Sequence, residues 1–192
     1  MILSRLKNMV PHPLKRATRQ VLQNVWESTR YLLSVKNFDD GRISHVIFVC
    51  KGNICRSAFA EYYLRRQIPE GALKIESCGL DVDQGIFSPA EAVCIAREFN
   101  VDLKLHRSKS FACCDVNNAD LILPMEYRQY LRLRAIFPGE KGKIRLLRDF
   151  APWPERLCCN INDPFGSGEN EFRRCFRRLQ RALDGLKSHL AT

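Results

Sequence analysis

The sequence predicts an α/β fold in which a parallel β-sheet lies between two layers of helices. Short apolar runs rich in β-branched residues alternate along the chain with longer segments of helical periodicity. Such alternation is typical of a parallel sheet with helices on both faces, a three-layer sandwich. With 192 residues, of which 45% are hydrophobic and 27% charged, the chain also has the size and composition of one globular domain.

The first predicted strand, residues 43–49, combines Ile, Val and Phe in one buried run. Shorter apolar runs predict three more strands at residues 73–77, 121–125 and 144–147. The spacing of apolar residues predicts helices at residues 14–36, 57–67, 89–99, 126–136 and 169–189. We therefore expect a four-stranded parallel sheet, with ligands bound beyond the carboxyl ends of its strands.

Residues 1–42 are predicted to form a basic extension to a domain of residues 43–192. The extension holds eight Lys and Arg against three acidic residues, which is half of the net charge of +10. The turn-rich residues 37–41 mark the boundary. The helix expected at residues 14–36 is amphipathic, and such an appended helix packs on its domain or on a second copy more often than on a membrane surface.

Other features argue against several classes of protein. No apolar run approaches the roughly 18 residues of a membrane-spanning helix. The N-terminus lacks the apolar core and the cleavage site of a secretory signal, so we expect a cytoplasmic protein. Nine cysteines without an export signal argue against a disulfide framework, and their spacing matches no zinc site. No metal ligands are therefore predicted.

The segment directly after the first strand carries the residue types of an anion site with a nucleophile. This segment, the 50–57 loop, reads Cys50-Lys51-Gly52-Asn53-Ile54-Cys55-Arg56-Ser57. Gly52 suits a turn, and Asn53 tolerates a left-handed conformation. A loop that leads into a helix N-terminus in this way turns backbone N–H groups toward an anion. Cys50 would be a thiolate nucleophile there.

Further residues have predicted chemical tasks. Arg56 supplies a planar fork that binds two oxygens of a tetrahedral oxyanion. Ser57 can donate its hydroxyl to the sulfur when the thiolate leaves, and Asn53 braces the loop. Transfer of a phosphoryl group also needs an acid for the departing oxygen. Asp163 is the candidate, because it lies in a turn-prone segment and Pro164 fixes its backbone.

Together these segments resemble the low-molecular-weight protein tyrosine phosphatase family. The 50–57 loop is similar to the family's phosphate loop, and Asp163-Pro164-Phe165 is similar to its late general-acid motif. Segments that begin at Glu76, His106 and Ala119 resemble further family segments. The resemblance covers residues 45–190 and leaves residues 1–42 outside. It implies the flavodoxin-like, phosphotyrosine phosphatase I-like fold.

The resemblance implies hydrolysis of phosphotyrosine through a cysteinyl phosphate, with no metal or organic cofactor. By resemblance, Cys50 attacks phosphorus, Arg56 holds the phosphoryl oxygens, and Asp163 protonates the leaving group and then activates water. The rest of the loop binds phosphate: Lys51, Gly52, Asn53, Ile54, Cys55 and Ser57. The residues implied to lie behind the loop or at the cleft are His106, which braces the loop, and Ser77, Phe87 and Phe165.

The resemblance also bears on regulation and partners. Cys55 matches a cysteine that forms a reversible disulfide with the nucleophile in many family members, and a buried packing role is equally well supported. The expected partner is a phosphotyrosine-containing protein. Bacterial relatives often act on tyrosine kinases that govern exopolysaccharide export. Nucleic acid is not an expected partner.

Three other functions stay open at this point. A protein arginine phosphatase has the same fold, but Ile54 argues against it because such relatives tend to have threonine there. A thioredoxin-linked arsenate reductase needs two spaced cysteines, whereas Cys113 and Cys114 are adjacent. A non-catalytic module would bind phosphate or nucleic acid through basic residues of the last helix, which we expect to be merely its solvent-facing side: Arg173, Arg174, Arg177, Arg178 and Arg181.

Overall fold

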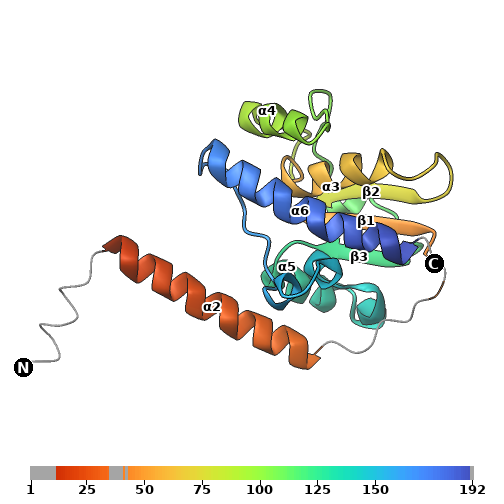
Figure 1. Cartoon of the computed structure of the whole chain (residues 1–192). Helices are drawn as coiled ribbons and strands as arrows, with labels where there is room; N and C mark the ends of the chain where they lie inside the picture. Colours follow the sequence, from red (N-terminus) through yellow and green to blue (C-terminus); the bar gives the residue numbers. More distant parts are fainter. Residues whose placement is uncertain (1–11, 35–40, 42, 191–192) are drawn as a thin grey trace, which may run out of the picture.

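A computed structural model of the chain describes residues 12–34, 41 and 43–190. Its parallel sheet has the strand order β2-β1-β3, formed by β1 (His45–Cys50), β2 (Lys74–Gly79) and β3 (Leu121–Pro124) (Figure 1). The central strand β1 is buried at every position, as a strand covered on both faces must be. Cys50 lies beside Gly79 of β2, and Val49 lies beside Pro124 of β3. The three strands therefore end at one edge of the sheet.

The predicted fourth strand does not form. Residues 144–147 supply one isolated bridge between Ile144 and Ile122 of β3, supported by the backbone N–H of Arg145, which donates to the Ile122 oxygen at 3.0 Å. At Leu147 the chain already turns into the 3₁₀ helix η3 (Leu147–Phe150), so strand pairing ends after one bridge. The expectation of four strands was wrong, whereas the α/β class with a parallel sheet is confirmed.

All five predicted helices are present in the described residues, with ends shifted by a few residues. They are α2 (His12–Ser34), α3 (Arg56–Arg65), α4 (Ala90–Glu98), α5 (Tyr127–Ile136) and α6 (Glu169–Leu190). Three further 3₁₀ helices occupy connections: η1 (Phe111–Cys113), η2 (Pro138–Lys143) and η4 (Glu155–Leu157). The predicted boundary at residues 37–41 lies outside the described residues except for Gly41, as do residues 35 and 36 of the first predicted helix.

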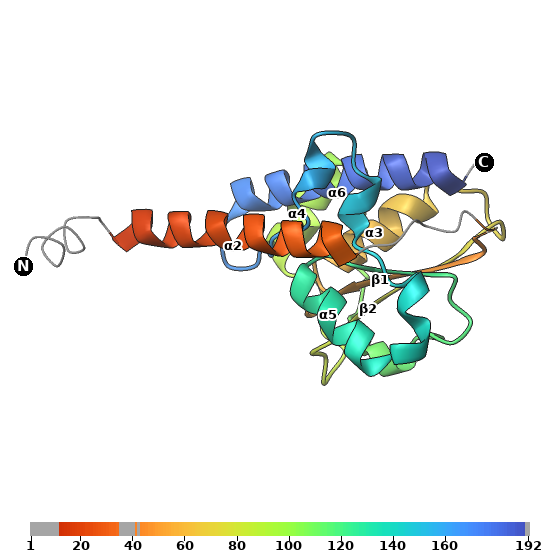
Figure 2. The same ribbon diagram turned by 90° about the horizontal axis from the view of Figure 1, so that it is seen from below.

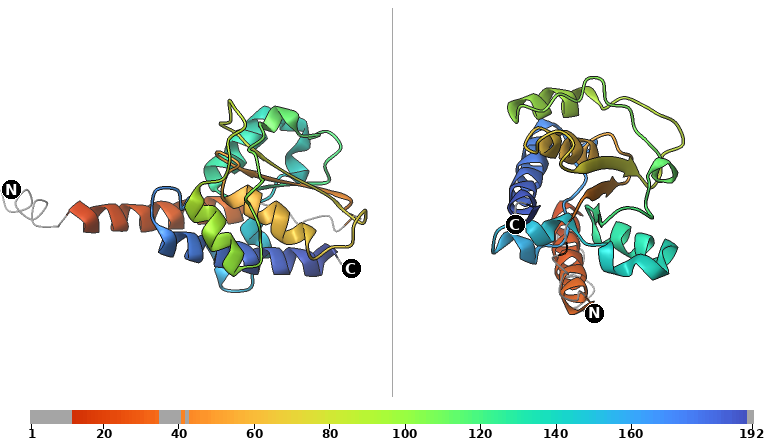
Figure 3. Two further views of the ribbon diagram at one scale, coloured as in Figure 1. Left: turned by 90° about the horizontal axis from the view of Figure 1, so that it is seen from above. Right: turned by 90° about the vertical axis from the view of Figure 1, so that its right-hand side faces the viewer.

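Side chains of β1 alternate between two apolar cores. Val46 and Phe48 lie in one core with residues of α3, α4 and α6, and Ile47 and Val49 lie in the other with residues of α5. Figures 2 and 3 show the same division, with α3, α4 and α6 on one side of the sheet and α5 on the other, while α2 lies between α5 and α6. The predicted three-layer arrangement is confirmed.

Helix α6 packs on the domain through one apolar stripe and turns its arginines to the other side. The stripe repeats at helical spacing and is fully buried: Phe172, Phe176, Leu179, Leu183 and Leu186. The ring of Phe176 stacks on Phe59 of α3, with 4.2 Å between the centroids. A Cβ atom at Gly185 would lie 1.9 Å from the carbonyl oxygen of Phe150. Only glycine allows α6 to approach η3 this closely.

Helix α2 docks on the domain through a buried tyrosine. The hydroxyl of Tyr31 donates to the carboxylate of Asp149 and accepts the backbone N–H of Leu146 at 3.0 Å. The ring of Tyr31 meets that of Tyr130 in α5 edge to face, with 5.0 Å between the centroids. One turn earlier, the hydroxyl of Ser28 accepts the backbone N–H of Cys159 at 3.1 Å.

The remaining docking contacts of α2 are also polar. The side-chain nitrogen of Asn160 donates to Asn24 Oδ1 at 3.0 Å and to Glu27 Oε2 at 2.6 Å. The opposite side of the helix is apolar and exposed: Leu22, Val25, Trp26, Leu32 and Leu33. The helix packs on its domain, as expected, but its apolar face points away from it. No helix in the described part of the chain is both long and apolar enough to span a membrane.

Candidate active site

The 50–57 loop joins the end of β1 to the start of α3 and bends around the sulfur of Cys50. Cys50 is the last residue of β1, and α3 begins at Arg56. The backbone N–H of Asn53 donates to Cys50 Sγ at 3.2 Å. Asn53 has a φ of 51°, in the left-handed region, whereas the φ of Gly52 is not positive. The bend therefore depends on Asn53 more than on Gly52.

Asn53 is fully buried, and all of its polar groups are hydrogen-bonded, to residues of the loop and to residues behind it. Its side-chain nitrogen donates to Ser57 Oγ at 2.9 Å and to Ser77 Oγ at 2.8 Å, and its Oδ1 accepts the backbone N–H of Lys109 at 2.8 Å. Its carbonyl oxygen lies 2.7 Å from Nε2 of His106. Burial lowers the pKa of His106, so the neutral ring donates its Nε2–H to this carbonyl.

The hydroxyl of Ser57 lies between two acceptors. Its oxygen is 3.0 Å from Cys50 Sγ and 3.2 Å from the carbonyl oxygen of Cys78. A hydroxyl has one proton to donate, and the side-chain amide of Asn53 already donates to this oxygen. The Ser57 proton can therefore turn either to the sulfur or to the carbonyl oxygen, and in both positions the hydroxyl donates one hydrogen bond and still accepts one from Asn53.

Arg56 is buried, with 1% of its surface exposed, and carboxylates fix its guanidinium. Nη1 donates to Glu126 Oε1 at 2.6 Å and to the carbonyl oxygen of Ile161 at 3.0 Å, and Nη2 donates to Asp163 Oδ2 at 2.6 Å. Nε has no hydrogen-bond partner among the described residues. Burial alone would lower the pKa of Arg56, but electrostatic interactions with Cys50, Glu126 and Asp163 raise it above its ordinary value. The site therefore holds a permanent cation whose Nε–H is unused by the described residues.

These groups surround a pocket of about 210 Å³ at the carboxyl edge of the sheet, where ligands of parallel sheets bind. It is lined by Cys50, Lys51, Gly52, Ile54, Cys55, Arg56, Asp81, Asp163 and Phe165. Three of these, Cys50, Arg56 and Asp163, are the residues with the predicted catalytic tasks. In the described part of the chain, no three His, Cys, Asp or Glu side chains are grouped so that they could hold a metal ion.

Of two other predicted residues, Phe87 lies outside the pocket and Cys55 lines it. Phe87 does not line this pocket; its ring is half exposed and lies under the guanidinium of Arg107, whose carbon is 4.1 Å from the ring centroid. Cys55 is buried and lines the same pocket as Cys50, and both cysteines are free thiols. Burial raises the pKa of Cys55, so its thiol stays protonated.

Residues that the sequence reasoning missed complete the site. Glu126, which orients Arg56, directly precedes α5, so an acidic residue just after the third strand was the available signal. Asp81 lines the pocket, and its backbone N–H donates to the Lys51 oxygen at 2.9 Å. A Cβ atom at Gly79 would lie 2.8 Å from that oxygen and 2.9 Å from the backbone nitrogen of Asn53. Position 79 must therefore lack a side chain for the loop to adopt this form.

The cysteine pair considered for an arsenate relay lies away from this pocket. Cys113 is exposed at the end of η1. Cys114 is half-buried, and its interaction with Cys78 of β2 lowers the pKa of Cys114. Neither cysteine lines the pocket of Cys50. In the described geometry, neither thiol of this pair therefore lies next to Cys50.

A comparison with protein families matches residues 45–192 to the low molecular weight phosphotyrosine protein phosphatases. The chain belongs to this family. As a low molecular weight phosphatase, it is a phosphoric monoester hydrolase of the protein-tyrosine-phosphatase kind. It is 35% identical over 139 residues to the low molecular weight protein-tyrosine-phosphatase Wzb of Escherichia coli (strain K12), a match that covers 72% of this chain and 90% of Wzb.

Solved structures of similar fold include phosphatases for two kinds of substrate. The tyrosine phosphatase amsI of Erwinia amylovora has a TM-score of 0.72 and 27% identity, over 81% of this phosphatase and 99% of amsI. The arginine phosphatase YwlE of Geobacillus stearothermophilus has a TM-score of 0.68 and 26% identity, over 77% of this phosphatase and 93% of the other chain. The extension before residue 45 lies outside the family match.

Proposed function

We propose that this phosphatase hydrolyses phosphotyrosine in proteins through a cysteinyl phosphate on Cys50. The observation that carries the proposal is the buried guanidinium of Arg56 beside the thiol. Glu126 and Asp163 fix its position before any substrate arrives, and Nε has no partner among the described residues. A phosphoryl oxygen is the acceptor that a fork of this kind binds best. Because the fork is already in place, it stabilises the transition state without reorganisation.

In the first step, the sulfur of Cys50 attacks phosphorus while the bond from phosphorus to the tyrosine oxygen breaks. Asp163 donates a proton to the departing oxygen. In the free protein Asp163 pairs with Arg56. A bound phosphoryl group takes over that place on Arg56, and its negative charge favours the protonated carboxyl that a general acid must supply.

In the second step, water attacks phosphorus and the bond from phosphorus to sulfur breaks. The carboxylate of Asp163 accepts the proton of the water, and inorganic phosphate leaves. The hydroxyl of Ser57 turns from the carbonyl oxygen of Cys78 to the sulfur, which lies 3.0 Å away, and stabilises the leaving thiolate. The backbone N–H of Asn53 donates to the same sulfur.

The proposed substrate is a phosphotyrosine-containing protein. The apolar side chains of Ile54 and Phe165 border the pocket and suit an aromatic ring better than a guanidinium group. We propose a bacterial tyrosine kinase as the partner and the cytoplasm as the compartment. A thiolate nucleophile needs reducing surroundings, and the structure has nine free cysteines.

The test is hydrolysis of matched peptides that contain phosphotyrosine, phosphoserine or phosphoarginine, without added metal. We expect turnover of the phosphotyrosine peptide only, and none by Cys50→Ser. Asp163→Asn should lower kcat on that peptide by about 10²–10⁴-fold, because it removes the general acid. The same variant should lose less on para-nitrophenyl phosphate, whose leaving group departs without a proton. Asp83→Asn, an exposed aspartate outside the pocket, is the matched control.

The outcomes separate the open functions. Faster hydrolysis of phosphoarginine would retain the chemistry and change the substrate class to that of the arginine phosphatase. A wild-type protein that is inactive on all three peptides and on para-nitrophenyl phosphate would refute the proposal. Arsenate reduction and phosphate binding without catalysis would then be the functions to test.

A further inference from the structure

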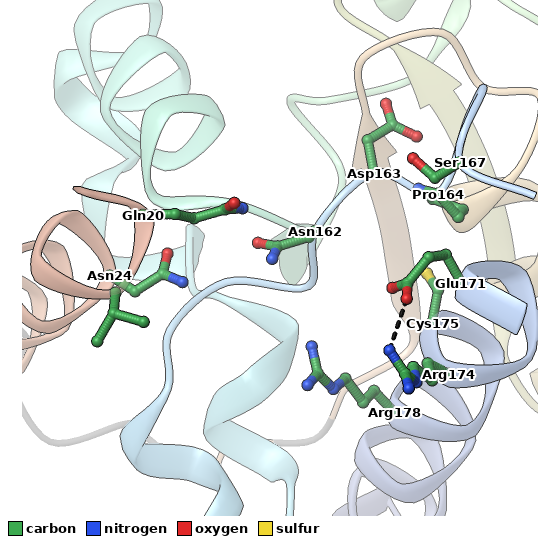
Figure 4. A pocket seen from close by; sticks show the side chains of 11 residues that line it. Gln20, Asn24, Asn162, Asp163, Pro164, Ser167, Glu171, Arg174, Cys175 and Arg178 are labelled. Atoms are coloured by element: carbon green, nitrogen blue, oxygen red, sulfur yellow. Dashed lines mark hydrogen bonds and ion pairs between the residues drawn. The ribbon is translucent and has the colours of Figure 1, made fainter. Parts of the chain in front are cut away.

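A basic groove lies beside the catalytic pocket, between α2, the segment around Asp163 and α6 (Figure 4). It consists of two adjoining hollows of about 440 Å³ and about 710 Å³. Four residues line both hollows: Asn24, Asn162, Arg174 and Arg178. Asp163 lines the first hollow and also the pocket of Cys50. The basic groove therefore begins where the catalytic pocket ends.

Arginines outnumber acidic residues in the basic groove. Five arginines line it: Arg148, Arg174, Arg177, Arg178 and Arg181. Glu171 pairs with Arg174 at 2.6 Å, the contact dashed in Figure 4, and Glu155 pairs with Arg181 at 2.6 Å and with Arg148 at 3.3 Å. Arg177 and Arg178 form no ion pair with the residues that the structure describes. The groove thus keeps positive charge that its own carboxylates do not neutralise.

Arg178 lines both hollows of this groove. In Figure 4 its guanidinium points into the space between α6 and Asn162. Burial lowers the pKa of Arg148, Glu155 opposes that shift, and the neighbouring charge of Arg178 adds to it. The side-chain amide of Asn162 makes no hydrogen bond to another described side chain or backbone group. The groove therefore presents both charge and unused donors to a ligand.

One wall of the basic groove comes from the extension. Gln20, Val21 and Asn24 of α2 face α6 across the first hollow. These residues precede the family match, which begins at residue 45. The contacts of Asn160 with Asn24 and Glu27 hold this wall in place. The extension thus adds a surface next to the active site that the matched part of the chain does not contain.

We propose that the basic groove binds an anionic stretch of the protein substrate that flanks the phosphotyrosine, through carboxylates or a second phosphate. This inference rests on the proposed function, because the substrate chain must leave the catalytic pocket past Asp163 to enter the groove. Arginine binds carboxylate and phosphate through charge-assisted hydrogen bonds. Complementary charge next to the reacting group lowers KM and speeds association, and added salt weakens both effects.

The test compares KM among phosphotyrosine peptides of equal length. The first peptide has neutral glutamines on both sides of the phosphotyrosine, the second has glutamates on the N-terminal side, and the third has glutamates on the C-terminal side. The fourth has a second phosphotyrosine in place of the glutamates. We expect about a fivefold or larger decrease in KM for anionic residues on one side only, as one or two charge-assisted contacts give. The difference should shrink between about 50 and about 300 mM NaCl. The last peptide distinguishes phosphate from carboxylate as the preferred anion.

Two pairs of variants locate the effect. Arg177→Gln with Arg178→Gln should remove the preference for the anionic peptide and leave kcat and KM on para-nitrophenyl phosphate unchanged. Arg66→Gln with Arg97→Gln removes the same charge from exposed positions outside the groove and is the matched control. On α2, Val21→Asp should raise KM for the anionic peptide, whereas Leu33→Asp, on the same helix but outside the groove, should not.

Equal KM values for neutral and anionic peptides, with normal turnover of para-nitrophenyl phosphate, would overturn this inference and leave the proposed function intact. An equal loss of preference in the control pair would also overturn it, because the effect would then come from net charge. Absence of turnover on every substrate would instead be a failure of the proposed function. A preference that only the groove variants abolish would establish the groove as a substrate site.

Discussion

The docking of α2 can be tested by removing one oxygen atom. Tyr31 is 2% exposed, and its hydroxyl accepts the buried backbone N–H of Leu146 while it donates to Asp149. In Tyr31→Phe the ring still packs against α5, and Asp149 keeps Arg145 as a partner at 3.0 Å. The Leu146 N–H, however, loses its acceptor inside the protein. An unsatisfied buried donor costs about 1–3 kcal/mol, so we expect the free energy of unfolding to fall by about 2 kcal/mol.

Equilibrium unfolding in urea, followed by circular dichroism, measures this loss. For a chain of this length, a decrease of about 2 kcal/mol also lowers Tm by about 4–8 °C. Leu33→Ala is the control, because Leu33 on the same helix is 84% exposed and should change stability by less than about 0.5 kcal/mol. If Tyr31→Phe were as stable as the control, α2 would not dock through Tyr31 and the wall of the basic groove would be missing.

Three further predictions concern the 50–57 loop and the residues that position it. Glu126→Gln should lower kcat on para-nitrophenyl phosphate by about 10–100-fold, because Arg56 loses the carboxylate that orients it, and an unchanged kcat would contradict that role. Gly79→Ala should lower activity at least about tenfold by pushing the 50–57 loop aside, whereas Gly139→Ala, where a Cβ atom meets nothing within 4 Å, should be neutral. Burial lowers the pKa of His106 below its unfolded value of 6.5, so the stability that its neutral ring contributes is complete above that pH and declines as the pH falls. Urea midpoints at about pH 7.5 and about pH 5.5 should therefore differ less in His106→Gln than in the wild type, and an equal difference would refute this.

Local signals were sufficient to predict the bend and the helix start in the 50–57 loop. A buried strand, a cysteine, Gly and Asn for a bend, and Arg-Ser at a helix start occur within one short stretch of sequence. The structure shows a left-handed Asn53 in that bend and begins α3 at Arg56. Backbone geometry of this kind is set by neighbouring residues, so sequence reasoning can reach it.

The features that sequence reasoning missed depend on contacts between distant segments. Glu126 reaches Arg56 only because β3 lies beside β1 and both end at the same edge. The run at residues 144–147 has strand-like composition, but the 3₁₀ helix that begins at Leu147 ends the pairing after one bridge. Composition indicates that a segment can pair; it does not indicate where the chain must turn to cover a core.

The orientation of α2 is the clearest case of this limit. Helical periodicity identified an apolar face but not which face meets the domain. The face that packs on the domain is determined by the hydrogen bonds of Tyr31, Ser28 and Asn24, whose partners belong to the second half of the chain. Buried polar groups need partners, and the segment before Asp163 supplies them.

Because α2 is attached through its polar side, folding does not remove its apolar side chains from water. Folding dehydrates its polar side, while Leu22, Trp26 and Leu33 stay in contact with water. Apolar surface contributes roughly 25 cal/mol per Å² when it is removed from water. Because the hydrogen bonds to Asn160 and Cys159 lie on the other side, a surface that covers the apolar face would not compete with them. The helix thus has two faces with different contacts: polar groups attach one face to its own domain, and the other face exposes apolar side chains that a second surface could cover.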